Sequence, residues 1–160
     1  MKNKLELRMY GFVNYQLSGI QSGIQFAHGV VEYGLKYFKD KDYQDWAQNN
    51  KTVIVLNGGT TRTVGWKEDG GTMQQHLWTL RRNKIKVATF HEPDLNRAMT
   101  AITFLVDERV FNKEKYPDYK LEVFDVLGSP GQKKRFRNYK NIIGKQNLFL
   151  REFLKQFKLA

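Results

Sequence analysis

The chain has 160 residues, 41% of them hydrophobic, no cysteine, and a formal net charge of +11. This length and hydrophobic content fit one globular domain and argue against a disordered chain. Without cysteine there are no disulfides, no thiolate zinc ligands and no thiol nucleophile. The N-terminal residues show no signal peptide, and no apolar run reaches the roughly 18 residues that span a bilayer. We therefore expect a soluble, cytoplasmic protein without a membrane partner.

The first half of the chain predicts a strand, a helix and a second strand. We place a strand at residues 5–17, a helix at 18–38, a short helix within 40–50 and a strand at 52–56. The last of these is almost wholly apolar and β-branched, which is typical of a central strand buried on both faces. On the long helix, apolar residues repeat at helical spacing, and we expect them to face a sheet: Ile20, Ile24, Ala27, Val31, Leu35 and Phe38.

The second half continues this alternation. We predict a helix at 72–83, a strand at 85–90, a loop at 91–98 and a strand at 100–106. The order of segments favours the α/β class, as a single-domain α/β/α sandwich with a four-stranded mixed sheet. We predict that residues 1–110 form this core. Residues 111–160 then form a basic, partly helical extension packed on it, with a short strand at 120–127 and a closing helix at 141–159.

Most of the positive charge lies near the C-terminus. Residues 129–160 hold nine basic side chains and one acid, Glu152, which leaves +8 of the +11. Aromatic residues alternate with the basic ones, and phosphate attraction combined with aromatic surface favours RNA as the partner. The candidate RNA-binding residues are Lys133, Lys134, Arg135, Arg137 and Lys140. The alternative is a solvated basic tail with no partner.

The long helix also carries a polar stripe. Gln21, Gln25, His28 and Glu32 follow one another at spacings of four, three and four, which places them on one helical face. This face begins just after a strand, where open α/β sheets tend to bind ligands. An amide can position water or a ribose hydroxyl, and a histidine can exchange protons near neutral pH. The alternative is an ordinary polar face.

A second candidate is the acidic loop between the last two predicted strands. Glu92 or Asp94 could orient a water molecule or accept a proton, and Thr100 would begin the next strand close to them. In the alternative interpretation the loop is a simple turn, in which Asp94 and Asn96 bond their own backbone.

Two further kinds of site have little basis in the sequence. The Gly-rich turn at residues 57–62 could offer backbone amides to a phosphate, but it lacks the Gly-Lys-Ser/Thr ending of a P-loop. The histidines, His28, His76 and His91, lack the spacing of a zinc-binding helix, so we expect no metal and no cofactor.

Residues 23–29, GIQFAHG, resemble the signature helix of the archaeal and eukaryotic (type 2) peptidyl-tRNA hydrolases. Gln25 matches the glutamine of that signature and His28 its histidine. Gln21 stands near the position of the family's lysine, and Phe26 replaces its cysteine. The similarity spans roughly residues 5–106 and follows the same order of segments. The chain is similar to a divergent branch of the family, of the kind that phages encode.

The resemblance implies hydrolysis of the ester bond of peptidyl-tRNA, in the host cytoplasm if a phage encodes the protein. It implies that Glu92 or Asp94 orients the attacking water, since both fall in the family's aspartate-bearing turn. Gln25 and His28 would bind the terminal ribose or stabilise developing charge, and Thr100 would complete the pocket. Two alternatives on the same fold stay open: a non-catalytic RNA-binding protein and a host-modulating interaction protein. A homodimer is compatible with each.

Overall fold

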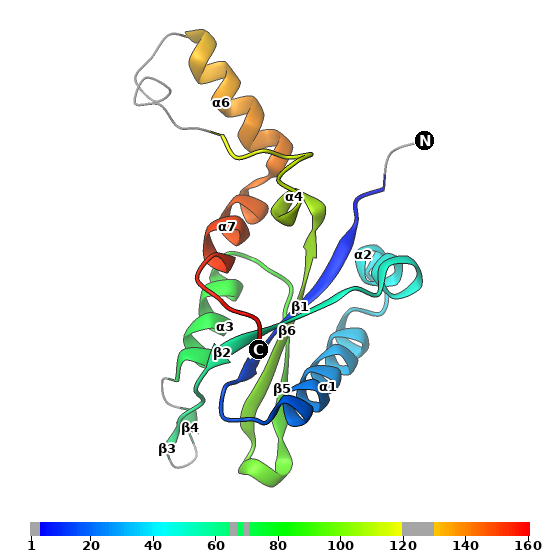
Figure 1. Cartoon of the computed structure of the whole chain (residues 1–160), viewed down its shortest axis with the longest axis vertical. Helices are drawn as coiled ribbons and strands as arrows, with labels where there is room; N and C mark the ends of the chain where they lie inside the picture. Colours follow the sequence, from blue (N-terminus) through cyan, green and yellow to red (C-terminus); the bar gives the residue numbers. More distant parts are fainter. Residues whose placement is uncertain (1–3, 65–66, 69–70, 120–129) are drawn as a thin grey trace.

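A four-stranded mixed sheet runs through the molecule and carries helices on both faces (Figure 1). The computed structural model describes residues 4–64, 67–68, 71–119 and 130–160. The strands are β1 (Leu7–Asn14), β2 (Val53–Gly59), β5 (Ala88–Glu92) and β6 (Ala98–Asp107), in the order β2-β1-β6-β5. β1 and β2 are parallel, and the other two pairs are antiparallel. The predicted class, a single-domain α/β/α sandwich with a four-stranded mixed sheet, is confirmed.

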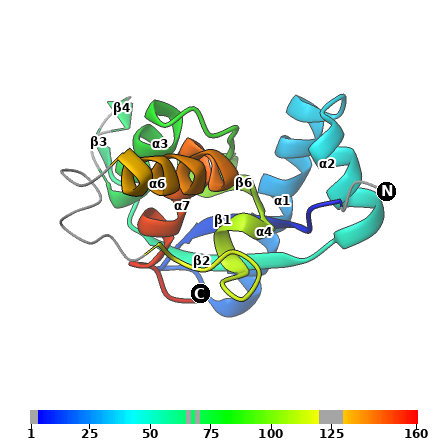
Figure 2. The ribbon, with the colours of Figure 1, turned by 90° about the horizontal axis from the view of Figure 1, so that it is seen from above.

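The helices divide between the two faces of the sheet (Figure 2). On one face lie α1 (Gly19–Tyr37), α2 (Lys41–Asp45) and a π-helical turn, η1 (Trp46–Asn50). On the other lie α3 (Thr72–Arg82) and α7 (Lys145–Leu154), with α6 (Pro130–Ile143) beyond them. Shorter elements are β3 (Thr63–Val64), β4 (Lys67–Glu68), η2 (Pro93–Leu95) and α4 (Glu108–Phe111). None of the helices in the described part of the chain has the length and apolar character needed to cross a membrane.

The central strand β1 supplies both hydrophobic cores by alternation. Leu7, Met9 and Val13 belong to the cluster under α1. Tyr10 and Phe12 belong to the cluster under α3 and α7. Because successive side chains of a strand point to opposite faces, one apolar strand can fill two cores at once. This explains why β1 lies in the middle of the sheet.

The prediction that residues 52–56 form a central strand is wrong, because β2 lies at an edge of the sheet. Its outer side is covered by the C-terminal residues of the chain. The amide of Asn57 donates to the carbonyl of Lys158 (3.1 Å), and the amide of Ala160 donates to the carbonyl of Val55 (3.0 Å). This pairing shields an otherwise open edge, which explains how so apolar a segment is tolerated there.

Helix α1 begins and ends close to the predicted positions, but it faces the sheet with a different side. Ile20, Ile24, Val31, Leu35 and Phe38, all predicted to face the sheet, are 48–81% exposed. The buried side instead consists of Ser22, Gln25, Phe26, Gly29, Tyr33 and Gly34. The sequence expectation for this stripe is therefore wrong.

The physical reason is the close approach of α1 to the sheet at Gly29. A Cβ atom at Gly29 would lie 2.8 Å from Cγ2 of Thr103 and 3.2 Å from Cβ of Ala101. The Thr103 hydroxyl donates to the carbonyl of Gly29 at 2.8 Å. Only a helix side with small residues at this point fits against the sheet, so the bulkier apolar stripe turns to the outside.

The C-terminal residues form two helices, where one was predicted at 141–159. Gly144, with a φ of +88°, separates α6 from α7, since this backbone conformation favours glycine. Leu150 and Phe153 of α7 lie in the core with α3, whereas α6 stands away from the sheet (Figure 1). The predicted strand at 120–127 falls outside the described residues, and the proposed division at residue 110 stays a prediction.

Arg151 of α7 joins the segment after β6 to both C-terminal helices. Its guanidinium is buried and donates to the carbonyls of Arg109 (2.7 Å) and Tyr116 (2.7 Å), the carboxylate of Asp118 (2.8 Å) and the hydroxyl of Tyr139 (3.1 Å). These bonds satisfy a charge that would be costly to bury unpaired. Arg151 therefore has a structural role, although it belongs to the basic C-terminal region.

Two glycines of α1 provide a matched test of this packing. We expect Gly29→Ala to lower the free energy of unfolding by about 1–2 kcal/mol, because the clash with Thr103 outweighs alanine's helix propensity. A Cβ added at Gly23 would have no atom within 4 Å, so Gly23→Ala should raise stability by about 0.5–1 kcal/mol. Urea unfolding followed by circular dichroism measures both. Equal effects of the two substitutions would contradict the close approach.

Candidate functional site

A chain of hydrogen bonds links α1 to the last two strands at the carboxyl end of β1. The hydroxyl of Thr100 donates to Oε1 of Gln25, and Nε2 of Gln25 donates to Oε2 of Glu92, both at 2.5 Å. Thr100 is 1% exposed, Gln25 is 8% exposed and Glu92 is half-buried. The buried amide therefore holds one oxygen of a carboxylate that still reaches the surface. These three predicted site residues come together although 75 residues separate Gln25 from Thr100.

A β-bulge directs Thr100 into this chain. β5 and β6 pair Phe90 with Ala101 and then His91 with Met99, so Thr100 is an extra residue in β6. Met99 lies in the cluster under α3, but Ala101 lies in the cluster under α1. The irregularity turns Thr100 to the α1 side, where its hydroxyl meets Gln25. Bulges commonly re-aim a side chain in this way beside functional sites.

His28 lies on the same seam between α1 and β5, one helical turn after Gln25. Its ring packs against that of Phe90, with the centroids 4.5 Å apart and the planes tilted by 59°. The residue is exposed. The structure thus places His28 beside the chain of Gln25, Glu92 and Thr100, with one ring face against β5.

The acidic loop is shorter than predicted, since His91 and Glu92 belong to β5. Asp94 lies in the 3-10 turn η2 and is exposed. The turn is closed by a hydrogen bond between Nδ1 of His91 and the carbonyl of Arg97 (3.1 Å). Of the two candidate carboxylates, Glu92 is hydrogen-bonded to Gln25, and Asp94 is not part of this row of hydrogen bonds.

The other members of the predicted polar stripe have different surroundings. Gln21 forms a capping box with Ser18 at the start of α1: each side chain accepts from the other residue's amide, at 3.0 and 3.3 Å. This motif stabilises a helix N-terminus, and the amide oxygen of Gln21 takes part in it. Glu32 is half-buried at a hollow between α1 and β5. Neither residue is hydrogen-bonded to the chain of three.

The two glycines of the predicted Gly-rich turn, Gly58 and Gly59, form the end of β2. The amide of Gly59 donates to Oδ1 of Asn57 (2.9 Å), and the amide of Thr60 donates to Oγ1 of Thr72 (2.8 Å). Thr72 also donates to the carbonyl of Gly58 at 3.1 Å. The amides of Gly59 and Thr60 are therefore already engaged within the protein, and Thr72 fastens this segment to α3.

The predicted RNA-binding residues gather on α6. Lys133, Lys134, Arg135, Arg137 and Lys140 are all exposed, and α6 holds no acidic residue. Two aromatic side chains of α6 contact Tyr119. The Tyr119 ring is 5.4 Å from that of Phe136 and 5.3 Å from that of Tyr139, centroid to centroid. The ammonium of Lys140 lies 4.2 Å from the Phe136 ring. The basic side chains of α6 therefore face solvent, whereas its aromatic side chains are half-buried.

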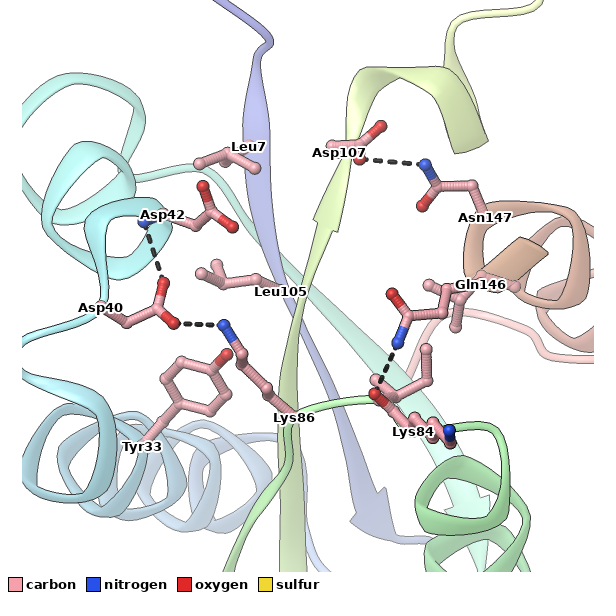
Figure 3. A pocket seen from close by; sticks show the side chains of 12 residues that line it. Leu7, Tyr33, Asp40, Asp42, Lys84, Lys86, Leu105, Asp107, Gln146 and Asn147 are labelled. Atoms are coloured by element: carbon pink, nitrogen blue, oxygen red, sulfur yellow. Dashed lines mark hydrogen bonds and ion pairs between the residues drawn. The ribbon is translucent and has the colours of Figure 1, made fainter. Parts of the chain in front are cut away.

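A polar pocket of about 150 Å³ lies at the opposite end of the sheet, between α2 and α7 (Figure 3). Asp40 in this pocket forms an ion pair with Lys86. Burial opposes ionisation of Asp40, but the hydrogen bonds from Lys86 and the Asp42 amide outweigh it and lower the pKa of Asp40. Burial raises the pKa of the nearby Tyr33 hydroxyl well above its usual range. Sequence patterns did not predict this pocket, because its residues come from several distant segments.

Two further polar residues of this pocket, Gln146 and Asn147, are hydrogen-bonded. Nδ2 of Asn147 donates to Asp107 (3.0 Å), and Nε2 of Gln146 donates to the carbonyl of Lys84 (2.7 Å). These contacts, visible in Figure 3, join α7 to the end of β6 and to the segment between α3 and β5. Elsewhere too, within the described ranges, no three histidine, aspartate or glutamate residues are grouped so that they could hold a metal ion.

No protein-family model matches the sequence, and no curated protein matches it either. The resemblance to type 2 peptidyl-tRNA hydrolases has no support from these comparisons. The case for a function therefore rests on the residues of this chain.

Removal of the hydrogen bond from Thr100 to Gln25 should lower the stability of the protein. Thr100→Val keeps the shape of the side chain but leaves the buried Oε1 of Gln25 without its donor. We expect the free energy of unfolding to fall by about 1–3 kcal/mol. The control is Thr89→Val on β5, which is half-buried and should change stability by less than about 0.5 kcal/mol. Similar values for both variants in chemical denaturation would contradict the arrangement.

Proposed function

We propose that this protein hydrolyses the ester bond between a peptide and the 3′ end of tRNA. The observation that carries the proposal is the convergence of Gln25, Glu92 and Thr100 at the carboxyl end of β1. Open α/β folds commonly bind ligands at such strand ends. A partly exposed carboxylate held by a buried amide is a suitable group to orient and deprotonate water.

In the proposed reaction, Glu92 accepts a proton from a water molecule as that water attacks the ester carbonyl. The bond to the 3′ oxygen then breaks, and this oxygen leaves with the proton that Glu92 accepted, which restores the carboxylate. Gln25 already uses its amide oxygen and one amide hydrogen within the protein, so it positions Glu92. Thr100 in turn fixes the amide of Gln25. A carboxylate oriented in advance needs little rearrangement during the reaction.

His28 is exposed and lies three residues after Gln25 on α1. Its ring is held against Phe90, which restricts its orientation. A histidine can donate a proton or a hydrogen bond near neutral pH. We therefore assign His28 to the terminal ribose or to the departing 3′ oxygen, in the role that the resemblance implies.

The position of α6 favours a long substrate. In Figure 1, α6 lies at one end of the molecule, and the turn between β5 and β6 lies at the other. Basic residues on α6 contribute to affinity through phosphate contacts, and such contacts carry no sequence information. A ligand that reaches both α6 and Glu92 has to extend along the whole sheet, as a tRNA can.

The catalytic role predicts different effects for the two carboxylates. Glu92→Gln keeps an acceptor for Gln25 but cannot take a proton, so we expect the rate of ester hydrolysis to fall at least 100-fold or so. Asp94→Asn, in the exposed turn, should leave the rate within about 3-fold of wild type. The assay is release of N-acetyl-aminoacyl groups from tRNA. A folded Glu92→Gln protein with wild-type activity would exclude the mechanism.

A non-catalytic RNA-binding protein is the second candidate function. The observation that favours it concerns Gln21. The family that the sequence resembles has a lysine near this position, whereas Gln21 belongs to a capping box and supplies no positive charge. Binding through α6 is common to both candidates. The hydrolysis assay separates them, because the second candidate predicts binding without ester cleavage by the wild-type protein.

Phosphate contact by α6 predicts a steep dependence of tRNA affinity on salt. Replacing Lys133 and Arg137 by alanine should weaken binding and reduce the slope of log K against log salt by about 0.9 for each phosphate that is no longer neutralised. The control, Lys39→Ala with Lys41→Ala, makes the same charge change on the other face of the sheet. Fluorescence anisotropy measures both slopes. Identical slopes for the two double variants, or a flat wild-type dependence, would refute binding through α6.

A further inference from the structure

Helix α1 leaves a row of large apolar side chains in solvent, on the side away from the sheet. We call this row the α1 stripe; it comprises Ile20, Ile24, Ala27, Val31, Leu35 and Phe38. Ile20 is 81% exposed, and the other large members are between 48% and 68% exposed. Since the opposite side of the helix is already buried against β5 and β6, α1 has two apolar sides and only one is covered by described residues.

The spacing of the α1 stripe is that of a helix–helix seam. Positions 20 and 27 are seven residues apart, and so are positions 24, 31 and 38. Apolar residues at alternating intervals of three and four form the contact line of paired helices. Most surface helices carry one such line and turn it to their own core. In the α1 stripe the line faces outward; its successive intervals are four, three, four, four and three, so it departs from strict alternation once, between Val31 and Leu35.

The exposed area is large enough for a dimer. Five large side chains at these exposures leave on the order of 500 Å² of apolar surface in water, near the upper limit for monomeric proteins. Two such surfaces together reach the roughly 1,000 Å² that a specific interface requires. A hollow of about 380 Å³ beside Leu35, bounded also by Ala88 and Thr89, adds room for a large side chain of a partner.

The charge distribution permits a second copy of this strongly basic chain to approach here. α1 carries one acid, Glu32, and one base, Lys36, and so has no net charge. The basic residues of α6 lie on the other side of the sheet (Figure 2). Two copies that meet through α1 therefore keep their basic helices apart, so electrostatic repulsion between them is weak.

We propose that two copies of this chain form a symmetric dimer in which the α1 stripes pack antiparallel. In this arrangement Ile20 faces the partner's Phe38, and Ile24 faces the partner's Leu35. Ala27 faces the partner's Val31 near the two-fold axis, so the smallest residue of the stripe meets a medium-sized one. A parallel pair would instead place Ala27 against its own copy and leave a gap. A two-fold axis makes one patch complementary to itself, as such an interface requires.

The dimer does not involve Gln25 and Glu92, because they lie on the sheet side of α1, whereas the exposed His28, four residues after Ile24 and seven before Leu35, flanks the α1 stripe. The primary test is the mass of the wild-type chain by analytical ultracentrifugation. We expect twice the 18.9 kDa of one chain. Leu35→Glu should raise the dissociation constant at least ~10-fold by burying an unpaired charge in the seam. The control, Ile142→Glu, makes the same kind of change at an exposed apolar residue of α6 and should leave the dimer intact.

Cysteine crosslinking tests the antiparallel orientation without background, since the chain has no cysteine. A mixture of Ile20→Cys and Phe38→Cys proteins should be joined by a short bifunctional maleimide. Each variant alone should give no crosslinked dimer. Crosslinking of each variant with itself would show a parallel pair and refute the proposed geometry. A wild-type monomer throughout the concentration range would overturn the proposal, and a different protein or a lipid surface would then be the occupant of the stripe.

Discussion

The arrangement of the molecule depends on how closely α1 approaches β6. At Gly29 the helix backbone comes within reach of the Thr103 hydroxyl, which donates to it at 2.8 Å, and a side chain at position 29 would clash. This contact sets the rotation of the helix about its axis. The rotation points Gln25 at Thr100 and Glu92, and it turns the α1 stripe outward. One steric constraint thus positions both the candidate site and the proposed dimer surface.

The chemistry at the carboxyl end of β1 depends on a second irregularity. The bulge in β6 brings Thr100 to the α1 side of the sheet, where its hydroxyl fixes the amide of Gln25. Because that amide is occupied at both ends, its effect on Glu92 is to orient the carboxylate. His28, outside the hydrogen-bonded chain but on the same seam, has the exposure that contact with a substrate requires. The proposed division of labour follows from these differences in burial.

The basic C-terminal region contains buried and exposed charges that its composition does not separate. Arg151 is buried and bonds to Arg109, Tyr116 and Asp118, so its charge stabilises the position of α7. The basic side chains of α6 face solvent, and one of them, Lys140, places its ammonium 4.2 Å from the Phe136 ring. Positive charge therefore contributes to packing on α7, and on α6 it is exposed for the phosphate contacts proposed above. The separation of α6 from the sheet end that carries Glu92 favours an extended polyanion as ligand.

The sequence by itself determined the α/β class and the alternation of elements, because local periodicity and turn residues depend on neighbours along the chain. The grouping of Gln25 with His28, Glu92 or Asp94, and Thr100 in one site came from the resemblance to the hydrolase family and not from periodicity. Only the tertiary structure decided which side of α1 is buried, that β2 lies at an edge, and that Glu92 rather than Asp94 meets Gln25. These outcomes depend on steric fit, strand register and a bulge between segments distant in sequence, and hydrophobic patterns contain none of that information.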